Sequence, residues 1–177
     1  MVNERIAYTV ASAEMKMQKH TWSLPMGPLG NLHLHPELEF ILIKSGSFLF
    51  HIEEKTISLR EGDVLVINSR VPHFGEVVEE GSTFFIVQFC VPHEEKDIGS
   101  RFSRFFAPEA WRALSYPAKS EEARFLGKQI EHPLCTPYQR PETQTCYAMV
   151  CKYELLGFLY ENEYLSDAGV KTTEKMN

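Results

Sequence analysis

The sequence predicts a mainly β protein, an antiparallel sandwich or barrel, whose strands are followed by helices. Turn residues recur about every ten positions in the first half of the chain, and the segments between them alternate or run apolar. Helical spacing of apolar residues begins only after Pro92. With 177 residues, the chain is long enough for one domain with a substantial core, or for one domain with a helical appendage.

The expected strands follow one another with short turns. Arg5–Val10 mixes β-branched, aromatic and polar residues and is expected at a sheet edge. Leu32–Lys44 begins with alternation and ends in four apolar residues, Phe40 to Ile43, which need cover on both faces from a helix or a second subunit. Glu53-Glu54 is expected as a tight hairpin connection. The remaining strands expected are Ser47–Ile52, Lys55–Leu59, Val64–Ile67 and Thr83–Val91.

Helices are expected after Pro92. Ser120 can cap one of them, and Pro133 and Pro137 are expected to break the chain before the last. The expected helices are Ser100–Phe106, Pro108–Leu114, Glu121–Glu131 and Pro141–Glu163. The last carries an apolar stripe of Cys146, Met149, Tyr153, Leu156 and Tyr160. This stripe either packs on the chain's own sheet or forms a homodimer seam, and different faces could do both.

Composition narrows the class of protein. The formal net charge is −6 and basic residues stand singly, which argues against nucleic-acid binding by this chain itself. No apolar run approaches the ~18 residues of a membrane helix, and no signal-peptide core follows the first residues. The four cysteines form no CxxC pair and are expected as reduced thiols. We therefore expect a cytoplasmic protein with no membrane partner.

Histidine and carboxylate residues gather in one short run. His33, His35 and Glu39 stand at i, i+2 and i+6, so on a β-strand they would share one face. A fourth candidate, His73, follows Val71-Pro72. Imidazole and carboxylate together suit a divalent transition metal.

The spacing of these residues resembles the cupin family. Gly27-x5-His33-x-His35-x3-Glu39-x6-Gly46 resembles the first cupin motif, and Gly62-x5-Asn68-x-Arg70-x2-His73 resembles the second. The family usually has proline, glycine and asparagine where Asn68, Arg70 and Val77 stand, so the turn before His73 departs from the pattern. The resemblance implies a cupin-type double-stranded β-helix or jelly-roll barrel, with His33, His35, Glu39 and His73 as ligands of one metal.

Residues 5 to 163 more specifically resemble the sensing domain of AraC-type transcription regulators. The resemblance rests on His33-x-His35-Pro36-x-x-Glu39, on Leu59 to Ile67 and on Val71-Pro72-His73. It implies a cupin barrel over residues 1–92, a helical extension for packing and dimerisation over 93–165, and a linker or disordered tail over 166–177. Homodimerisation is expected through Pro141–Glu163. Such regulators bind DNA through a C-terminal helix-turn-helix domain, so we expect this sequence to be a piece of a longer protein.

The resemblance further implies a small effector inside the barrel. Residues that could contact it are Tyr8, His20, Trp22, His51 and Gln88. Trp22 could instead be a core or surface aromatic residue, and strand parity alone does not place His51. The metal is expected to be zinc, with nickel, manganese, iron and copper left open. Alternatively, the four ligands form only a hydrogen-bonded polar cluster.

Two other functions stay open on the sequence. One is a small metal-dependent cupin enzyme, a dioxygenase or an isomerase. The other is a dimerisation module alone, which predicts a filled barrel.

Overall fold

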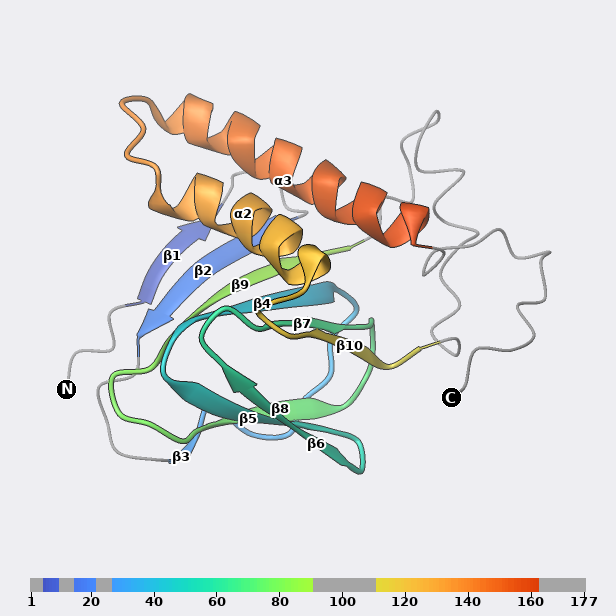
Figure 1. Cartoon of the computed structure of the whole chain (residues 1–177). Helices are drawn as coiled ribbons and strands as arrows, with labels where there is room; N and C mark the ends of the chain where they lie inside the picture. The colour runs from blue at the N-terminus through green and yellow to red at the C-terminus, as the bar shows by residue number, and fades with distance from the viewer. Residues whose placement is uncertain (1–4, 10–14, 22–26, 91–110, 163–177) are drawn as a thin grey trace.

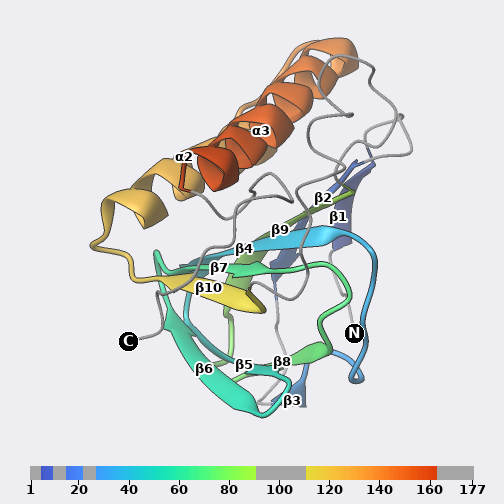
Figure 2. The ribbon, with the colours of Figure 1, turned by 90° about the vertical axis from the view of Figure 1, so that its right-hand side faces the viewer.

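Two antiparallel sheets face each other, and two helices cover the outer face of the larger sheet (Figure 1). The computed structural model describes residues 5–9, 15–21, 27–90 and 111–162. The larger sheet has the strand order β1-β2-β9-β4-β7-β10, and the smaller has the order β3-β8-β5-β6. Figure 2 shows the resulting three layers: helices, larger sheet, smaller sheet. The elements are β1 (Arg5–Thr9), β2 (Met15–Thr21), β3 (Gly27–Pro28), β4 (Leu38–Ser45), β5 (Ser47–Ile52), β6 (Lys55–Arg60), β7 (Val64–Ile67), β8 (His73–Val77), β9 (Thr83–Phe89), β10 (Ala113–Tyr116), α2 (Glu121–Cys135) and α3 (Pro141–Glu161).

The larger sheet is buried on both faces, as the apolar run in β4 predicts. Phe40 and Leu42 point outward into a cluster shared with α2 and α3, whereas Ile41 and Ile43 point inward toward the smaller sheet. All four side chains are at most 3% exposed. The helices therefore supply the cover that the sequence required. The chain has a mainly β, cupin-like two-sheet sandwich followed by two C-terminal helices.

Several expected elements are confirmed in place and type. β1 lies at the edge of the larger sheet, and the hairpin between β5 and β6 turns at Glu53, whose φ is 53°. Ser120 caps α2 by accepting a hydrogen bond from the backbone N–H of Ala123 at 3.0 Å. α3 begins at Pro141, as expected.

Three expectations about element boundaries are wrong. The strand expected from Leu32 begins only at Leu38. The helix expected over Pro108–Leu114 is wrong at its end, because Ala113–Tyr116 is a strand. This strand pairs with β7, so that the backbone groups at the edge of β7 form hydrogen bonds. Pro133 does not break α2 but lies inside it, where burial of the ring offsets the missing N–H donor.

Other expectations fall outside the described residues. They concern the helix over Ser100–Phe106, the side chain of Trp22 and the tail over 166–177. In the part of the chain that the structure describes, neither helix is both long and apolar enough to span a membrane.

Gly46 closes the first motif in a conformation that requires glycine. Its φ is +78°, and a Cβ there would overlap Ser82, whose Cα would lie only 2.9 Å away. We expect Gly46→Ala to lower the free energy of unfolding by about 3 kcal/mol, since strain and overlap add. Urea denaturation measures the loss. Gly81→Ala is the control, because Gly81 has the same φ of +78° but open space around it. An equal loss in both variants would show that the contact with Ser82 contributes nothing.

Candidate functional site

A cavity of about 220 Å³ lies between the two sheets. Strands β2, β4, β8 and β9 contribute to its wall, together with the segment that precedes β4. Its lining residues are Lys16, Gln18, His20, Leu29, Gly30, His33, Glu39, Phe50, His73, Phe74, Gly75, Phe84, Ile86 and Gln88. The volume corresponds to about seven water molecules at ~30 Å³ each.

Three histidines from two separate segments of the chain come together here, and two of them, His33 and His73, line the cavity. His33 forms an isolated antiparallel bridge with His73, through backbone hydrogen bonds of 3.1 and 2.9 Å. The His35 carbonyl accepts a hydrogen bond from the Arg70 N–H at 2.7 Å. Ring centroids are 4.4 Å apart for His33 and His73, and 5.2 Å apart for His35 and His73. Backbone pairing in the loop before β4 therefore brings the rings together, rather than alternation along a strand.

The turn before His73 keeps its shape despite the departures from the cupin pattern. Arg70 stands where the family has glycine and has a φ of +58°, in the left-handed region. Asn68 holds this turn through its side chain, which donates to the Trp111 carbonyl at 2.8 Å and accepts from the Ser69 N–H at 2.8 Å. His73 is therefore aimed into the cavity.

In each of the three histidines, the Nδ1 nitrogen lies against a backbone carbonyl oxygen. Nδ1 of His33 lies 2.9 Å from the Asn31 carbonyl, Nδ1 of His73 lies 2.8 Å from that of Val71, and Nδ1 of His35 lies 3.2 Å from that of Glu37. A carbonyl accepts only, so Nδ1 carries the proton in each ring. The ligand nitrogens of the three histidines all lie within 4.8 Å of one another. Fixing the tautomer through the outer nitrogen is how proteins prepare histidines to bind a metal.

Glu39 and Gln88 complete the polar floor. The Glu39 carboxylate Oε2 lies 2.7 Å from Nε2 of His35 and accepts a hydrogen bond from Nε2 of Gln88 at 2.6 Å. Burial alone would raise the pKa of Glu39, but His35, His73 and Gln88 together lower it from 4.5 to about 2. Burial opposes the charged form of His35 too, yet Glu39 and Glu37 raise its pKa above the ordinary 6.5. Without a metal, Glu39 and His35 are an ion pair.

One of the three ligand nitrogens is buried and has no hydrogen-bond partner among the described residues. His73 is 1% exposed, and its buried Nε2 has no hydrogen-bond partner there. The nearest carboxylate oxygen, on Glu39, is 3.6 Å away. A buried nitrogen lone pair without a donor is costly, and a divalent ion bound jointly by the three histidines would satisfy it. The residues present therefore fit a metal.

This ion pair predicts a pH dependence for the metal-free chain. The contribution of Glu39 is complete above pH 4.5 and is lost as the pH falls toward about 2. The contribution of His35 is complete below pH 6.5 and is lost as the pH rises through its raised pKa. Urea midpoints measured in EDTA should therefore be higher between these limits than outside them. His35→Gln should flatten the profile, and an unchanged profile in this variant would contradict the pairing.

The candidate effector residues separate into three groups. His20 and Gln88 line the cavity. His51 does not line the cavity: it alternates with the inward Phe50, and its ring stacks on Phe74 with centroids 4.3 Å apart. Tyr8 lies in β1, but its side chain, like Trp22, is outside the described part of the chain.

The sequence analysis missed Lys16 and Gln18, which line the cavity with His20. These three residues alternate along β2 with the buried Met15 and Met17. That alternation is the signal that could have found them. The sequence analysis predicts no strand over Met15–Thr21, and therefore does not predict that Lys16 and Gln18 share a face with His20.

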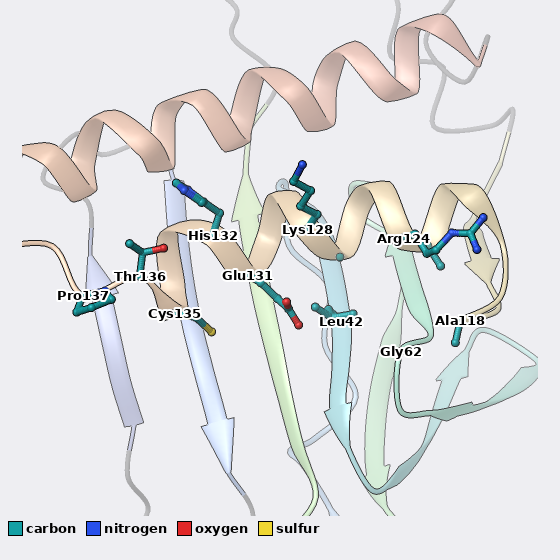
Figure 3. Close-up of a pocket in the computed structure, with 12 residues that line it drawn as sticks. Leu42, Gly62, Ala118, Arg124, Lys128, Glu131, His132, Cys135, Thr136 and Pro137 are labelled. Atoms are coloured by element: carbon teal, nitrogen blue, oxygen red, sulfur yellow. The ribbon is translucent and has the colours of Figure 1, made fainter.

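A second, larger groove of about 630 Å³ runs along α2 (Figure 3). Glu131 and Cys135 reach from α2 toward the strands, Glu131 beside Leu42 and Cys135 further along the helix. Leu42 belongs to the outward face of the larger sheet, so the sheet separates this groove from His33, His35 and His73. Glu131 is paired with Lys44 at 2.6 Å. The groove brings together no group of three metal ligands among the described residues.

Known proteins match part of the chain. A 62-residue stretch is 42% identical to an uncharacterised HTH-type transcriptional regulator, YdeC, of Bacillus subtilis strain 168. That stretch covers 35% of this chain and 21% of the relative, so the match spans about a fifth of the relative's length.

Solved structures with similar folds include cupins. An oxalate decarboxylase of Bacillus subtilis is 27% identical over 48% of this chain and 24% of its own, with a TM-score of 0.42. A cupin-2 domain protein from Shewanella frigidimarina is 17% identical over 50% of this chain and 79% of its own, with a TM-score of 0.38. Scores this low carry no argument about chemistry.

One family model covers most of the two sheets. Residues 28–114, from β3 into β10, match the model described as AraC-like ligand binding domain. The matched range contains all three histidines and Glu39. The segment from residue 28 to residue 114 therefore belongs to the AraC-like ligand binding domain family.

Proposed function

We propose that this chain is the effector-sensing and dimerisation part of an AraC-type transcription regulator. The observation that carries the proposal is a cavity between the sheets of a ligand binding domain, with polar side chains aimed into it. A filled barrel, which a dimerisation module alone would have, is not what these residues form. The effector would shift the protein between two states by binding one of them more tightly. As a bacterial-type regulator it would act in the cytoplasm.

A metal at the cavity floor is part of this proposal. His33, His35 and His73 would hold it, with Glu39 as the fourth ligand, and Zn²⁺ is the ion favoured by nitrogen and oxygen donors in this number. A bound Zn²⁺ would supply a Lewis acid for an oxygen atom of the effector. Gln88 would orient Glu39 through the 2.6 Å hydrogen bond.

The experiment that tests effector binding is a thermal-shift screen of small acids, sugars and amines on the 177-residue chain. Binding to the folded state raises the melting temperature. A Cβ at Gly75 would meet Leu29 at 2.6 Å and Phe50 at 3.1 Å, so Gly75→Val should narrow the cavity and abolish the shift caused by any hit. Glu76→Gln, one residue further along β8, is the control and should keep the shift. Hits that survive in Gly75→Val would place effector binding elsewhere.

Homodimerisation through α3 is proposed from its outer face. Leu155, Leu156 and Leu159 are buried against the chain's own core, whereas Val150 is 51% and Tyr160 is 50% exposed. In the apolar stripe expected from the sequence, Leu156 is buried against the core and Tyr160 is exposed. The stripe therefore does not lie on a single face of the helix. Exposed apolar residues along one helix are typical of an association surface.

Val150→Glu should weaken a dimer at least about tenfold, because a charge at an apolar seam must be desolvated. Sedimentation equilibrium measures the change. Ser58→Glu adds the same charge on the exposed side of β6 and should leave association unchanged. A wild-type chain that stays monomeric at high micromolar concentration would contradict this part of the proposal.

DNA binding in the whole protein is assigned to a helix-turn-helix region outside these 177 residues. The relative named as an HTH-type regulator supports this assignment. The chain's own charge of −6 does not suit a phosphate backbone.

A metal-dependent cupin enzyme is the second candidate, favoured by the histidine group with its neighbouring carboxylate. Oxygen uptake with iron, manganese or copper added distinguishes the two functions. Turnover that His73→Ala abolishes would replace the sensor by an enzyme.

A further inference from the structure

The inner face of β2 gives the cavity one polar wall. Lys16, Gln18 and His20 all point into it, two residues apart along the strand. In the sheet, Lys16 is in register with Gln88, which is in register with Glu39. A row of polar side chains therefore runs from the exposed Lys16 to the buried carboxylate at the floor.

The charge of this wall is unusual for the chain. The protein carries a net charge of −6, yet the cavity is lined by one ammonium group, that of Lys16, and one carboxylate, that of Glu39, together with the imidazoles of His20, His33 and His73. That carboxylate, Glu39, is already paired with His35 and Gln88. Lys16 forms no salt bridge with any described residue. The cavity is thus a local site for negative charge in an acidic protein.

Gln18 adds a directed donor beside Lys16. Its Oε1 accepts a hydrogen bond from Nε2 of His20 at 3.1 Å. The amide N–H groups of Gln18 form no hydrogen bond with any residue that the structure describes, and so can donate to a ligand. An ammonium and an amide two residues apart on one strand face are about 7 Å apart at the backbone, and their long side chains can reach one carboxylate together.

Apolar side chains line the cavity both beside this polar row and opposite it. Phe84 and Ile86 of β9 neighbour His20 and Gln18 in the larger sheet, and Phe50 of β5 lies in the smaller sheet that faces them. The His20 ring stacks on Phe84 with centroids 4.9 Å apart. Gly75 leaves open the space that a side chain would fill between Leu29 and Phe50. The volume of about 220 Å³ admits a molecule of on the order of ten non-hydrogen atoms.

We propose that the ligand of this cavity is a small organic monoanion, whose acidic group binds Lys16 and Gln18 and whose apolar body lies against Phe50 and Phe84. The inference rests on the proposed effector-binding function and names the class of ligand. Neutral sugars and cationic amines are disfavoured, because they leave Lys16 without a counter-charge.

Calorimetric titration of the 177-residue chain with phenylacetate and its neutral isostere phenylacetamide tests this class. Titrations are made in EDTA and again with one equivalent of Zn²⁺, so that a metal-bound carboxylate is distinguished from one held by Lys16. Phenylacetate should bind at least about tenfold more tightly than the amide in both conditions, because a charge-assisted hydrogen bond is roughly twice as strong as a neutral one.

Lys16→Met keeps an unbranched side chain that is one atom shorter and removes its charge, so it should remove the preference for phenylacetate. Lys19→Met is the matched control on β2. Lys19 has the opposite parity and acts electrostatically on Cys135 of α2, on the helix side of the sheet. This variant should keep the preference.

Equal binding of acid and amide, or an unchanged preference in Lys16→Met, would overturn the anionic class. If the anionic class is overturned in this way but Gly75→Val still prevents the amide from binding, the proposal that an effector binds in the cavity is retained. If neither compound binds, the anionic class is also overturned. If the thermal-shift screen finds no ligand either, the proposed effector-sensing function is wrong as well.

Discussion

Replacing His35 by alanine is expected to abolish stoichiometric binding of Zn²⁺. His35 offers one of three ligand nitrogens that lie within 4.8 Å of one another, and its Nε2 is 2.7 Å from Glu39. Loss of an outer partner of a metal ligand already costs about 10–100-fold in affinity, so loss of a ligand should cost more. The metal-to-protein ratio after dialysis against Zn²⁺, measured by plasma emission, should fall from one to near zero.

His51→Ala provides the control for this experiment. His51 is also a half-buried histidine, but it stands on the outer side of β5 against Phe74. The variant should keep one metal ion per chain. Full occupancy in His35→Ala, or loss in His51→Ala, would show that the ligands are assigned wrongly.

Leu126→Ala is expected to destabilise the sheets and the helices together. Leu126 is fully buried in the cluster that α2 and α3 share with the larger sheet. Large-to-small changes at such sites cost about 2–5 kcal/mol. Urea unfolding followed by near-ultraviolet and far-ultraviolet circular dichroism should show one shared transition at a lower midpoint. Lys128→Ala, on the exposed side of α2, should change stability by less than about 0.5 kcal/mol.

The same experiment tests how the chain is divided. The sequence predicts a barrel over residues 1–92 and a helical extension over 93–165. β10 pairs with β7 from beyond that boundary, and one cluster joins the larger sheet to both helices. Both contacts favour cooperative unfolding. Two separate transitions, with only one affected by Leu126→Ala, would favour two independent units.

Elements with strong local patterns could be predicted from the sequence. Phe40 to Ile43 needed cover on both faces, Glu53 needed a tight turn, and Ser120 needed a helix to cap. Each depends on residues close in the chain, so local physics decides it. Gly46 is different, because the approach of Ser82, which is distant in the sequence, adds to the left-handed φ in requiring glycine there.

Elements decided by distant partners could not be predicted. β10 forms because the edge of β7 needs hydrogen bonds, and nothing in Ala113–Tyr116 itself requires a strand. His33 and His35 were expected to share a strand face, but a bridge to His73 brings them together instead. Alternation along a strand therefore accounts for only part of the histidine site. Lys16 and Gln18 were missed because β2 was not expected.

X-ray absorption at the zinc edge, on the chain loaded with one equivalent of Zn²⁺, tests most directly whether His33, His35 and His73 bind the metal. The exposed Cys135 and Cys146 are competing soft ligands, so the scattering atoms decide where the metal binds. The histidine site predicts only nitrogen and oxygen neighbours at about 2.0–2.1 Å, with imidazole scattering. Sulfur at about 2.3 Å, or no zinc retained after dialysis, would contradict a metal at the floor of the cavity.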